Sequence, residues 1–189
     1  MDLKDIAFIA IGTNKFVNRK YITNLKNLLE YNMVKVNFNS NLIDKYNPFI
    51  LEKTFFERQV DERILIQKND IIVKLQSPVK FLFVSEEYKN VTLPITCGII
   101  RVTNQDIDSL SLWRYLNSSF TEKYLNKTTQ SNHGLVSGVS IQTIKSIPLN
   151  IDLLDNKKAK ILYEFEKLVN LENKKIELLK LYIKKANEE

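Results

Sequence analysis

The last part of the chain has a hydrophobic pattern of its own. From Asp155 to the C-terminus there is no glycine and no proline, and apolar residues recur at intervals of seven. A seven-residue repeat with β-branched residues at its first position is typical of helices that pair along an apolar seam. The positions of this seam are Leu162, Phe165, Val169, Ile176, Leu179, Ile183 and Ala186, and Glu172 interrupts it.

The predicted helix is too long for the domain that precedes it. About 33 residues give a helix of roughly 50 Å. We therefore expect part of it to project and to find a helical partner. The alternative is an amphipathic helix that packs back on its own domain.

In the middle of the chain, residues 33–38 alternate between apolar and polar positions as a strand does, and apolar runs bounded by turn residues predict further strands. Asn69-Asp70 forms a turn before one strand, and Ser77-Pro78 forms the turn between that strand and its hairpin partner. Pro94 and Gly98 are expected to break a later apolar run. The predicted strands are residues 33–38, 71–75, 79–84, one or two within 91–102, and an edge strand at 147–149.

Short helices are predicted on both sides of these strands. Residues 18–31 place Ile22, Leu25, Leu28 and Leu29 on one helical face behind a possible cap at Asn18. Further helices are expected after a cap at Asp108 or Ser109, at 120–127, and as a single turn at 141–145. The pattern predicts an α+β fold, with a globular domain of twisted mixed strands and short helices at 1–152 and a long helix at 153–189.

Composition narrows the function classes. Lys and Arg number 28 against 22 Asp and Glu, which gives a net charge of +6. A basic chain suits a polyanionic partner such as nucleic acid. However, Lys, Asn and Ile are abundant and Arg is scarce, so compositional bias explains the charge equally well. No stretch is long enough for a membrane span or a secretory signal, and we expect a cytoplasmic protein.

Several kinds of chemistry are missing from the sequence. Cys97 is the only cysteine and His133 the only histidine, so an intrachain disulfide and a Cys- or His-rich metal site are excluded. No GxGxxG or GK[ST] loop is present, and we expect no cofactor and no resident metal. An alternative is a Mg²⁺-dependent nuclease, because Asp70, Glu87 and Lys89 fit a loose Asp…Glu-x-Lys pattern.

Three segments, in this order, resemble a known family. LIQKNDIIVKLQSPVKFLFV (65–84) resembles a strand-turn-strand with the motif Leu-x-x-Gly-Asp-Ile-Ile, and LWRYLNSSFTEKYL (112–125) resembles the helix that follows it. The segment from Gly134 to Lys180 resembles a glycine-containing stretch that ends in Ile-Pro-Leu before a long helix. The family is that of the specificity (S) subunits of type I restriction–modification enzymes. The resemblance covers roughly residues 60–185, with Asn69 where the family has glycine.

The resemblance implies a non-catalytic protein that reads DNA sequence. Such subunits direct methyltransferase (M) and restriction (R) subunits, which carry the chemistry, to a bipartite site. Family members usually have two target-recognition domains and two long helices, whereas this chain has one of each. It is therefore similar to a half-subunit, which would pair through its C-terminal helix with a second copy or with a different half-subunit. A coiled-coil interaction module without a nucleic-acid role is the remaining alternative.

Two loops offer the side chains that DNA reading needs. Lysine neutralises phosphates, and Gln, Asn, Ser and Thr reach base edges. The predicted DNA-binding residues are Lys74, Gln76, Ser77 and Lys80 in one loop, and Lys127, Thr128, Gln130, Ser131, Asn132 and His133 in the other. The predicted helix interface consists of Leu162, Phe165, Val169, Ile176, Leu179 and Ile183.

Overall fold

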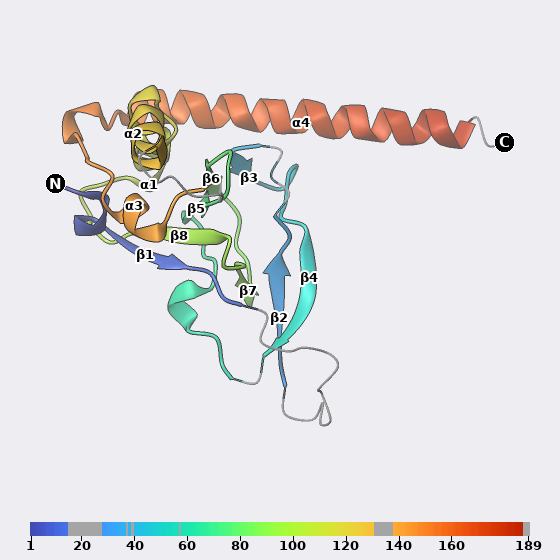
Figure 1. Ribbon diagram of the computed structural model, residues 1–189. Helices are drawn as coiled ribbons and strands as arrows, with labels where there is room; N and C mark the ends of the chain where they lie inside the picture. The colour runs from blue at the N-terminus through green and yellow to red at the C-terminus, as the bar shows by residue number, and fades with distance from the viewer. Residues whose placement is uncertain (15–27, 37, 39, 57, 131–137, 187–189) are drawn as a thin grey trace.

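The computed structural model describes residues 1–14, 28–36, 38, 40–56, 58–130 and 138–186, without the side chains of residues 129 and 130. The strands are β1 (Ala7–Ile11), β2 (Leu29–Val34), β3 (Leu42–Ile43), β4 (Leu51–Phe56), β5 (Ile71–Lys74), β6 (Lys80–Val84), β7 (Val91–Thr92) and β8 (Cys97–Val102). The α-helices are α1 (Ser109–Leu116), α2 (Ser119–Gln130), α3 (Ile141–Lys145) and α4 (Asn156–Ala186). Short 3-10 turns lie at η1 (Leu3–Asp5), η4 (Glu62–Ile64) and η5 (Ile151–Leu153). This arrangement confirms the predicted α+β fold (Figure 1).

A five-stranded sheet in the order β1-β8-β5-β6-β3 forms the centre of the domain. Its neighbouring strands are antiparallel except for β3 and β6, which are parallel. The central strand β5 is buried on both faces: Ile71 and Val73 belong to one core cluster and Ile72 to the other. The predicted hairpin is confirmed, because β5 and β6 pair from Ile71 opposite Phe83 to Lys74 opposite Lys80.

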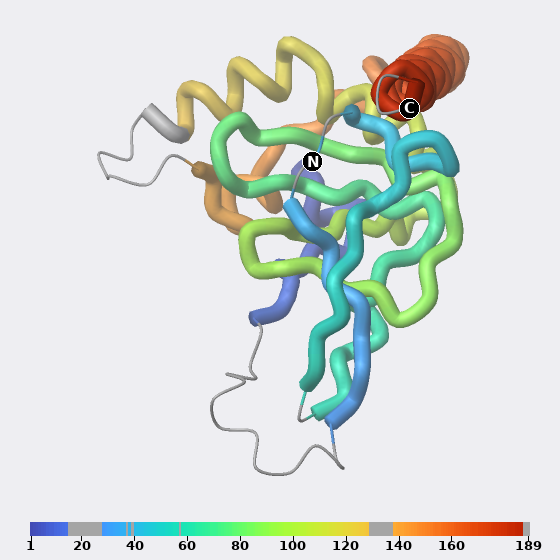
Figure 2. The backbone as a smooth tube through the Cα atoms, turned by 90° about the vertical axis from the view of Figure 1, so that its right-hand side faces the viewer, coloured from blue at the N-terminus to red at the C-terminus, as the bar shows by residue number. Residues whose placement is uncertain are grey.

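One face of this sheet is covered by helices. Residues of all four α-helices contribute to the core on that face, and Figure 2 shows α2 and α4 lying over the strands. Trp113 of α1 is completely buried, and its indole Nε1 donates a hydrogen bond to the Phe81 carbonyl at 3.1 Å. A fully buried indole N–H needs such a partner, because an unpaired buried donor is costly. This bond therefore fixes α1 directly onto β6.

A second sheet, in the order β4-β2-β7, extends away from α4 (Figure 1). The antiparallel strands β2 and β4 form an arm with a small core of its own, in which the rings of Tyr31 and Phe56 meet edge-on at 5.6 Å. The helix predicted at 18–31 is wrong at its end, since Leu29 begins strand β2. Residues 18–27 of that prediction lie outside the described residues. The strand predicted at 33–38 lies earlier, at 29–34.

The first half of α4 rests on the domain, and the second half projects. Ala159 and Asn170 are buried, and Leu162 and Tyr163 pack against the helical core. From residue 172 to 186 every residue of α4 is exposed. Figure 1 shows this end extending beyond the strands, as the sequence pattern predicts. Within the residues that the structure describes, no helix has both the length and the apolar character needed to cross a membrane.

The remaining local predictions are partly confirmed. Asp108 is the N-cap of α1, accepting a hydrogen bond from the Ser111 amide, and helices are present at 120–127 and 141–145. Gly98 does not break a strand but lies inside β8. The predicted edge strand at 147–149 is a single bridge between Asp2 and Pro148. That stretch is too short to form a ladder, so its neighbouring backbone groups bond individually to the N-terminal segment.

Candidate nucleic-acid interface

The chain just after the second predicted DNA-binding loop contacts the turn that carries the first one. Gln76, just after β5, forms an antiparallel bridge with Gly138, and the Val139 amide donates to the Leu75 carbonyl at 2.8 Å. This approach requires a glycine, because a Cβ on Gly138 would lie 2.8 Å from the Leu75 carbonyl oxygen. The glycine thus allows residues 138 and 139 to lie against the tip of the β5–β6 hairpin.

The hairpin tip carries a concentration of positive charge. Lys74 and Lys80 are opposite each other in the β5–β6 register, and both are half-buried. The Lys80 ammonium donates to the Phe38 carbonyl at 3.0 Å, which anchors it beside the sheet. Gln76 and Ser77, at the turn itself, are exposed. Two like charges on neighbouring strands destabilise a sheet, whereas an anionic ligand such as a phosphate would compensate them.

The second loop is described only at its start. Lys127 is exposed on α2, and the Thr128 hydroxyl donates to the Tyr124 carbonyl at 2.9 Å, so its proton is used within the helix. Gln130 ends α2, but its side chain is not among those described. Ser131, Asn132 and His133 lie outside the described residues. The DNA contacts predicted for this loop therefore remain predictions.

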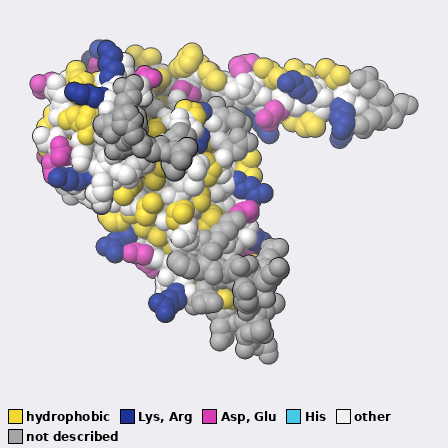
Figure 3. Space-filling model, viewed as in Figure 1, with side chains coloured by type: hydrophobic (Ala, Val, Ile, Leu, Met, Phe, Trp, Pro, Cys, Tyr) yellow, Lys and Arg dark blue, Asp and Glu magenta, His cyan; other side chains and the backbone are white. Residues whose placement is uncertain are grey.

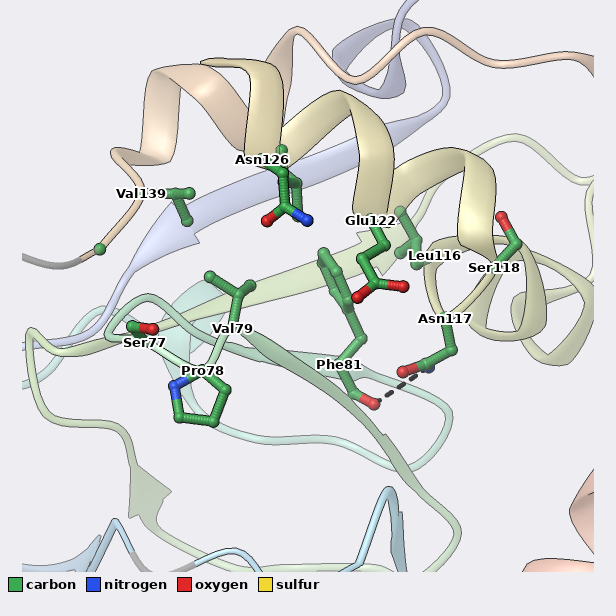
Figure 4. A pocket seen from close by; sticks show the side chains of 12 residues that line it. Ser77, Pro78, Val79, Phe81, Leu116, Asn117, Ser118, Glu122, Asn126 and Val139 are labelled. Atoms are coloured by element: carbon green, nitrogen blue, oxygen red, sulfur yellow. Dashed lines mark hydrogen bonds between the residues drawn. The ribbon is translucent and has the colours of Figure 1, made fainter. Parts of the chain in front are cut away.

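A cavity of about 380 Å³ separates the hairpin tip from α2. Figure 4 shows Ser77 and Pro78 on one side of it and Glu122 and Asn126 of α2 on the other. Glu122 and Asn126 are not among the residues predicted from the sequence. Their spacing of four residues on an exposed helical face is the signal that could have indicated them, because residues four apart lie side by side on a helix.

The opposite end of the hairpin has a different character. Asp70 is buried, and its two carboxylate oxygens accept hydrogen bonds from Arg101 Nε at 2.7 Å and Nη2 at 2.8 Å. The Gln67 amide donates to Oδ2 at 2.7 Å. Burial raises the pKa of Asp70, and the hydrogen bonds from Arg101 and Gln67 oppose that rise. Asn69, which precedes it, has φ 69°, the left-handed conformation in which the family's glycine is favoured.

This geometry does not favour the nuclease interpretation. Both oxygens of Asp70 are already occupied by a guanidinium and an amide, whereas a catalytic Mg²⁺ needs carboxylate oxygens as ligands. Glu87 and Lys89 are exposed in the loop after β6. Across the described part of the chain, no three His, Cys, Asp or Glu side chains gather in a way that could hold a metal ion. Asp70 instead links the hairpin to β8.

Cys97 of β8 is the register partner of Lys74 on the neighbouring strand β5. It is completely buried in the core between the two sheets. Burial raises the pKa of its thiol to about 11, although the Thr96 side chain and the charge of Lys74 act in the opposite direction. The thiol is therefore protonated at neutral pH, and since the thiolate is the reactive form, Cys97 is an inert core residue.

The predicted helix interface divides between two environments. Leu162 and Val169 are half-buried, and Leu162 packs against the chain's own core. The other four predicted residues are largely exposed: Phe165 60%, Ile176 47%, Leu179 62% and Ile183 62%.

Two further residues extend this exposed group. Ile161 and Leu168 are 70% and 60% exposed, and they follow the same spacing of three and four residues. Residues at this spacing share one helical face. We call the set Ile161, Phe165, Leu168, Ile176, Leu179 and Ile183 the outer stripe of α4. Figure 3 shows apolar side chains on the projecting part of α4, interspersed with charged ones.

The fold is that of known S subunits. No protein-family model and no curated protein matches the sequence. Among solved structures, the chain is similar to the type I restriction–modification system S subunit from M. genitalium, with 14% identity and a TM-score of 0.50, over 99% of this chain and 43% of that one. A structure from work on assembly and conformational transition of the type I R-M system has 13% identity and a TM-score of 0.45, over 94% and 43%. The chain thus spans less than half the length of either structure.

Proposed function

We propose that this chain is a DNA-recognition component of a type I restriction–modification system, comparable to half of an S subunit. The S-subunit fold supports the proposal, but one fold serves many functions. The observation that carries it is the contact between Gln76 and Gly138. That contact brings the chain directly after the second predicted loop against the turn that carries Gln76 and Ser77, and this supports a single surface for both sets of residues.

In this proposal the surface reads DNA and performs no chemistry. Lys74 and Lys127 bind phosphates and set the register on the duplex, while Gln76 and Ser77 reach base edges. Methylation and cleavage belong to M and R subunits that dock on the chain. The absence of phosphate-binding and dinucleotide-binding glycine motifs from the sequence agrees with such a division of labour.

We further propose that the outer stripe of α4 pairs with a second copy of this chain. The chain matches 43% of the S subunit of similar fold, so two copies together would span most of that protein. An isologous pair is the commonest symmetric arrangement. Antiparallel pairing of two α4 helices would hold two reading surfaces apart, and the resulting complex would recognise a bipartite site.

The DNA-binding part is tested by fluorescence anisotropy with a labelled random duplex at several salt concentrations. Lys127→Ala should weaken binding to all sequences similarly and lower the salt-dependence slope by about one. Lys175→Ala, which removes a charge from the projecting half of α4, is the matched control and should leave the slope unchanged. If the unaltered protein shows no salt-dependent DNA binding, a coiled-coil module without a nucleic-acid role becomes the better interpretation.

The pairing is tested by sedimentation of the full chain at micromolar concentration. The double variant Leu179→Lys/Ile183→Lys should shift a dimer to monomer, because it places charges in an apolar seam. Glu177→Gln, on another face of the same helix, should remain dimeric. A monomeric unaltered protein, with and without an M subunit present, would contradict the pairing.

The link to a restriction–modification system is tested with its methyltransferase. We expect an M subunit encoded with this chain to methylate DNA at defined sites only when the chain is added. The isolated chain with Mg²⁺ should leave plasmid DNA intact. Nicking that is lost in Asp70→Asn but retained in Asp61→Asn would instead favour the nuclease alternative.

A further inference from the structure

We infer that the cavity between the hairpin tip and α2 is a binding site for a cationic side chain, an arginine or a lysine, of a partner protein. The inference goes beyond the proposed DNA recognition and does not depend on it. It rests on the shape of the cavity, on the polar groups at its rim and on the charge of its lining.

The floor of the cavity is apolar. Phe81, Leu116, Leu125 and Val139 line it and are otherwise buried in the helical core. Pro78 forms a wall on the hairpin side (Figure 4). A volume of about 380 Å³ accommodates one long side chain with room for water. Lysine and arginine pack their methylene stems on apolar surfaces in this way while their charged ends stay in a polar environment.

The rim offers hydrogen-bond acceptors. Figure 4 shows the Glu122 side chain extending from α2 toward the cavity, beside Phe81. Asn117 uses its amide nitrogen on the Phe81 and Trp113 carbonyls, at 3.1 and 3.0 Å, so its own carbonyl oxygen is what it can present to a ligand. A carboxylate together with an amide oxygen suits a guanidinium or ammonium group, which only donates hydrogen bonds.

The cavity shares Ser77 with the proposed DNA-binding surface, but the charge of its lining differs from that of the lysines there. Although the chain as a whole has a net charge of +6, none of the described lining residues is a lysine or an arginine, and Glu122 is the only charged one. A phosphate would be repelled there. The ring of Phe81 adds an attraction for a cation that lies over its face. These features favour the side chain of a protein partner over the nucleic-acid backbone.

A base amino group is the competing occupant, because a carboxylate can accept a hydrogen bond from cytosine N4. However, a base carries flanking phosphates, and these would approach the Glu122 carboxylate. An arginine or lysine side chain carries a positive charge and brings no negatively charged group close to Glu122. The observations therefore favour the protein side chain, and the base becomes an outcome that the experiment distinguishes.

The test uses two small probes on the full chain, followed by NMR. The first is N-acetyl-arginine amide, and the second is its citrulline counterpart, which has nearly the same shape but no charge. We expect the arginine probe to shift the backbone amide signals of Asn117, Glu122 and Val139 and to bind about tenfold more tightly than the citrulline probe, as a charge-assisted hydrogen bond implies.

Two substitutions test whether the arginine probe binds through Glu122. Glu122→Gln should weaken binding of the arginine probe about tenfold and leave that of the citrulline probe unchanged. Glu87→Gln removes the same charge from an exposed loop elsewhere and should change neither. Both carboxylates are exposed, so neither substitution should impair folding.

Three results would overturn the inference. Equal binding of both probes, or undiminished arginine binding by Glu122→Gln, would show that the cavity does not select a cation. A change in DNA sequence preference in Glu122→Gln, without any change in arginine binding, would assign the cavity to a base. Loss of DNA binding in the parallel anisotropy experiment would refute the proposed function but not this site, since the probe titration contains no DNA.

Discussion

The two ends of the β5–β6 hairpin carry charged residues in opposite circumstances. At the base, Asp70 is buried and every oxygen of its carboxylate has a partner in Arg101 or Gln67. At the tip, Lys74 and Lys80 are opposite each other, and no carboxylate pairs with either in the described part of the chain. The same pair of strands thus has a fully hydrogen-bonded carboxylate at one end and, a few residues away, an excess of positive charge at the other.

This difference separates a structural role at the base from the proposed binding role at the tip. A charge that is buried must be fully hydrogen-bonded, or folding becomes unfavourable. Such a residue has no capacity left for a ligand. An unbalanced charge at the surface costs a little stability and is available to an outside partner. The residue types alone do not reveal which situation applies, since both ends consist of ordinary charged residues.

The largest expected effect is at the base. Asp70→Ala should lower the free energy of unfolding by about 3 kcal/mol, because it leaves the Arg101 guanidinium without its partner. Asp61→Ala is the matched control, since Asp61 and Arg63 form an ion pair with the same 2.7 Å contact but with both side chains exposed. Urea unfolding of the two variants measures the difference. An equal loss in both would remove burial as the explanation.

Cys97, across the sheet from Lys74, provides a test by pH. Its thiol is kept protonated in the folded state, whereas the unfolded chain ionises near the ordinary value of 9.0. The stabilisation is therefore complete below pH 9 and is lost as the pH rises toward about 11. Between these limits the unaltered protein should lose roughly 2 kcal/mol more than Cys97→Ala, as measured by urea unfolding. Identical pH profiles would contradict a buried thiol.

The contact at the hairpin tip depends on Gly138. Gly138→Ala should lower the free energy of unfolding by about 1–2 kcal/mol, because its Cβ would press on the Leu75 carbonyl. Under the proposed function DNA affinity should fall as well, since residues 138 and 139 would move away from the hairpin tip. Ser77→Ala, at the exposed turn, should change the stability little. Retained stability together with lost DNA binding in Gly138→Ala would mean that the contact orders the surface rather than the fold.

The smallest effect on folding, and the most informative, is expected for Lys74. Lys74→Gln should raise the free energy of unfolding by a few tenths of a kcal/mol, because it relieves the repulsion from Lys80. At the same time it should weaken DNA binding and lower the salt slope by about one. Opposite changes in stability and affinity are what a binding residue produces. If both decrease together, Lys74 belongs with the structural residues at the base.

Much of the fold was predictable because its signals are local. The hairpin at 71–84 consists of apolar strands bounded by turn residues, Asp108 caps α1, and α4 lacks glycine and proline. The start of the strand at 29–34 was assigned to a helix. Leu25, Leu28 and Leu29 fit a helical spacing, and only pairing with β4 and β7 decides in favour of a strand.

The candidate site was harder to predict from the sequence than the fold. The types of residue that could contact DNA were recognisable, but the partners that distinguish them were not. Asp70 matched a nuclease pattern until Arg101, 31 residues away, was found to occupy its oxygens. Glu122 was not selected at all, because the cavity that it faces is formed by β6, α1, α2 and the segment that begins at Gly138.

The sequence by itself determined the secondary elements with strong periodicity, the basic charge and the absence of phosphate- and dinucleotide-binding glycine motifs, because these depend on neighbouring residues and on composition. Only the tertiary structure decided which half of α4 is covered, which charges are saturated, and that Gln76 meets Gly138. Those properties arise from contacts between distant segments. The burial of a polar group and its hydrogen-bond partners decide how it affects stability and whether it can bind a ligand. Both are defined only once the segments are packed.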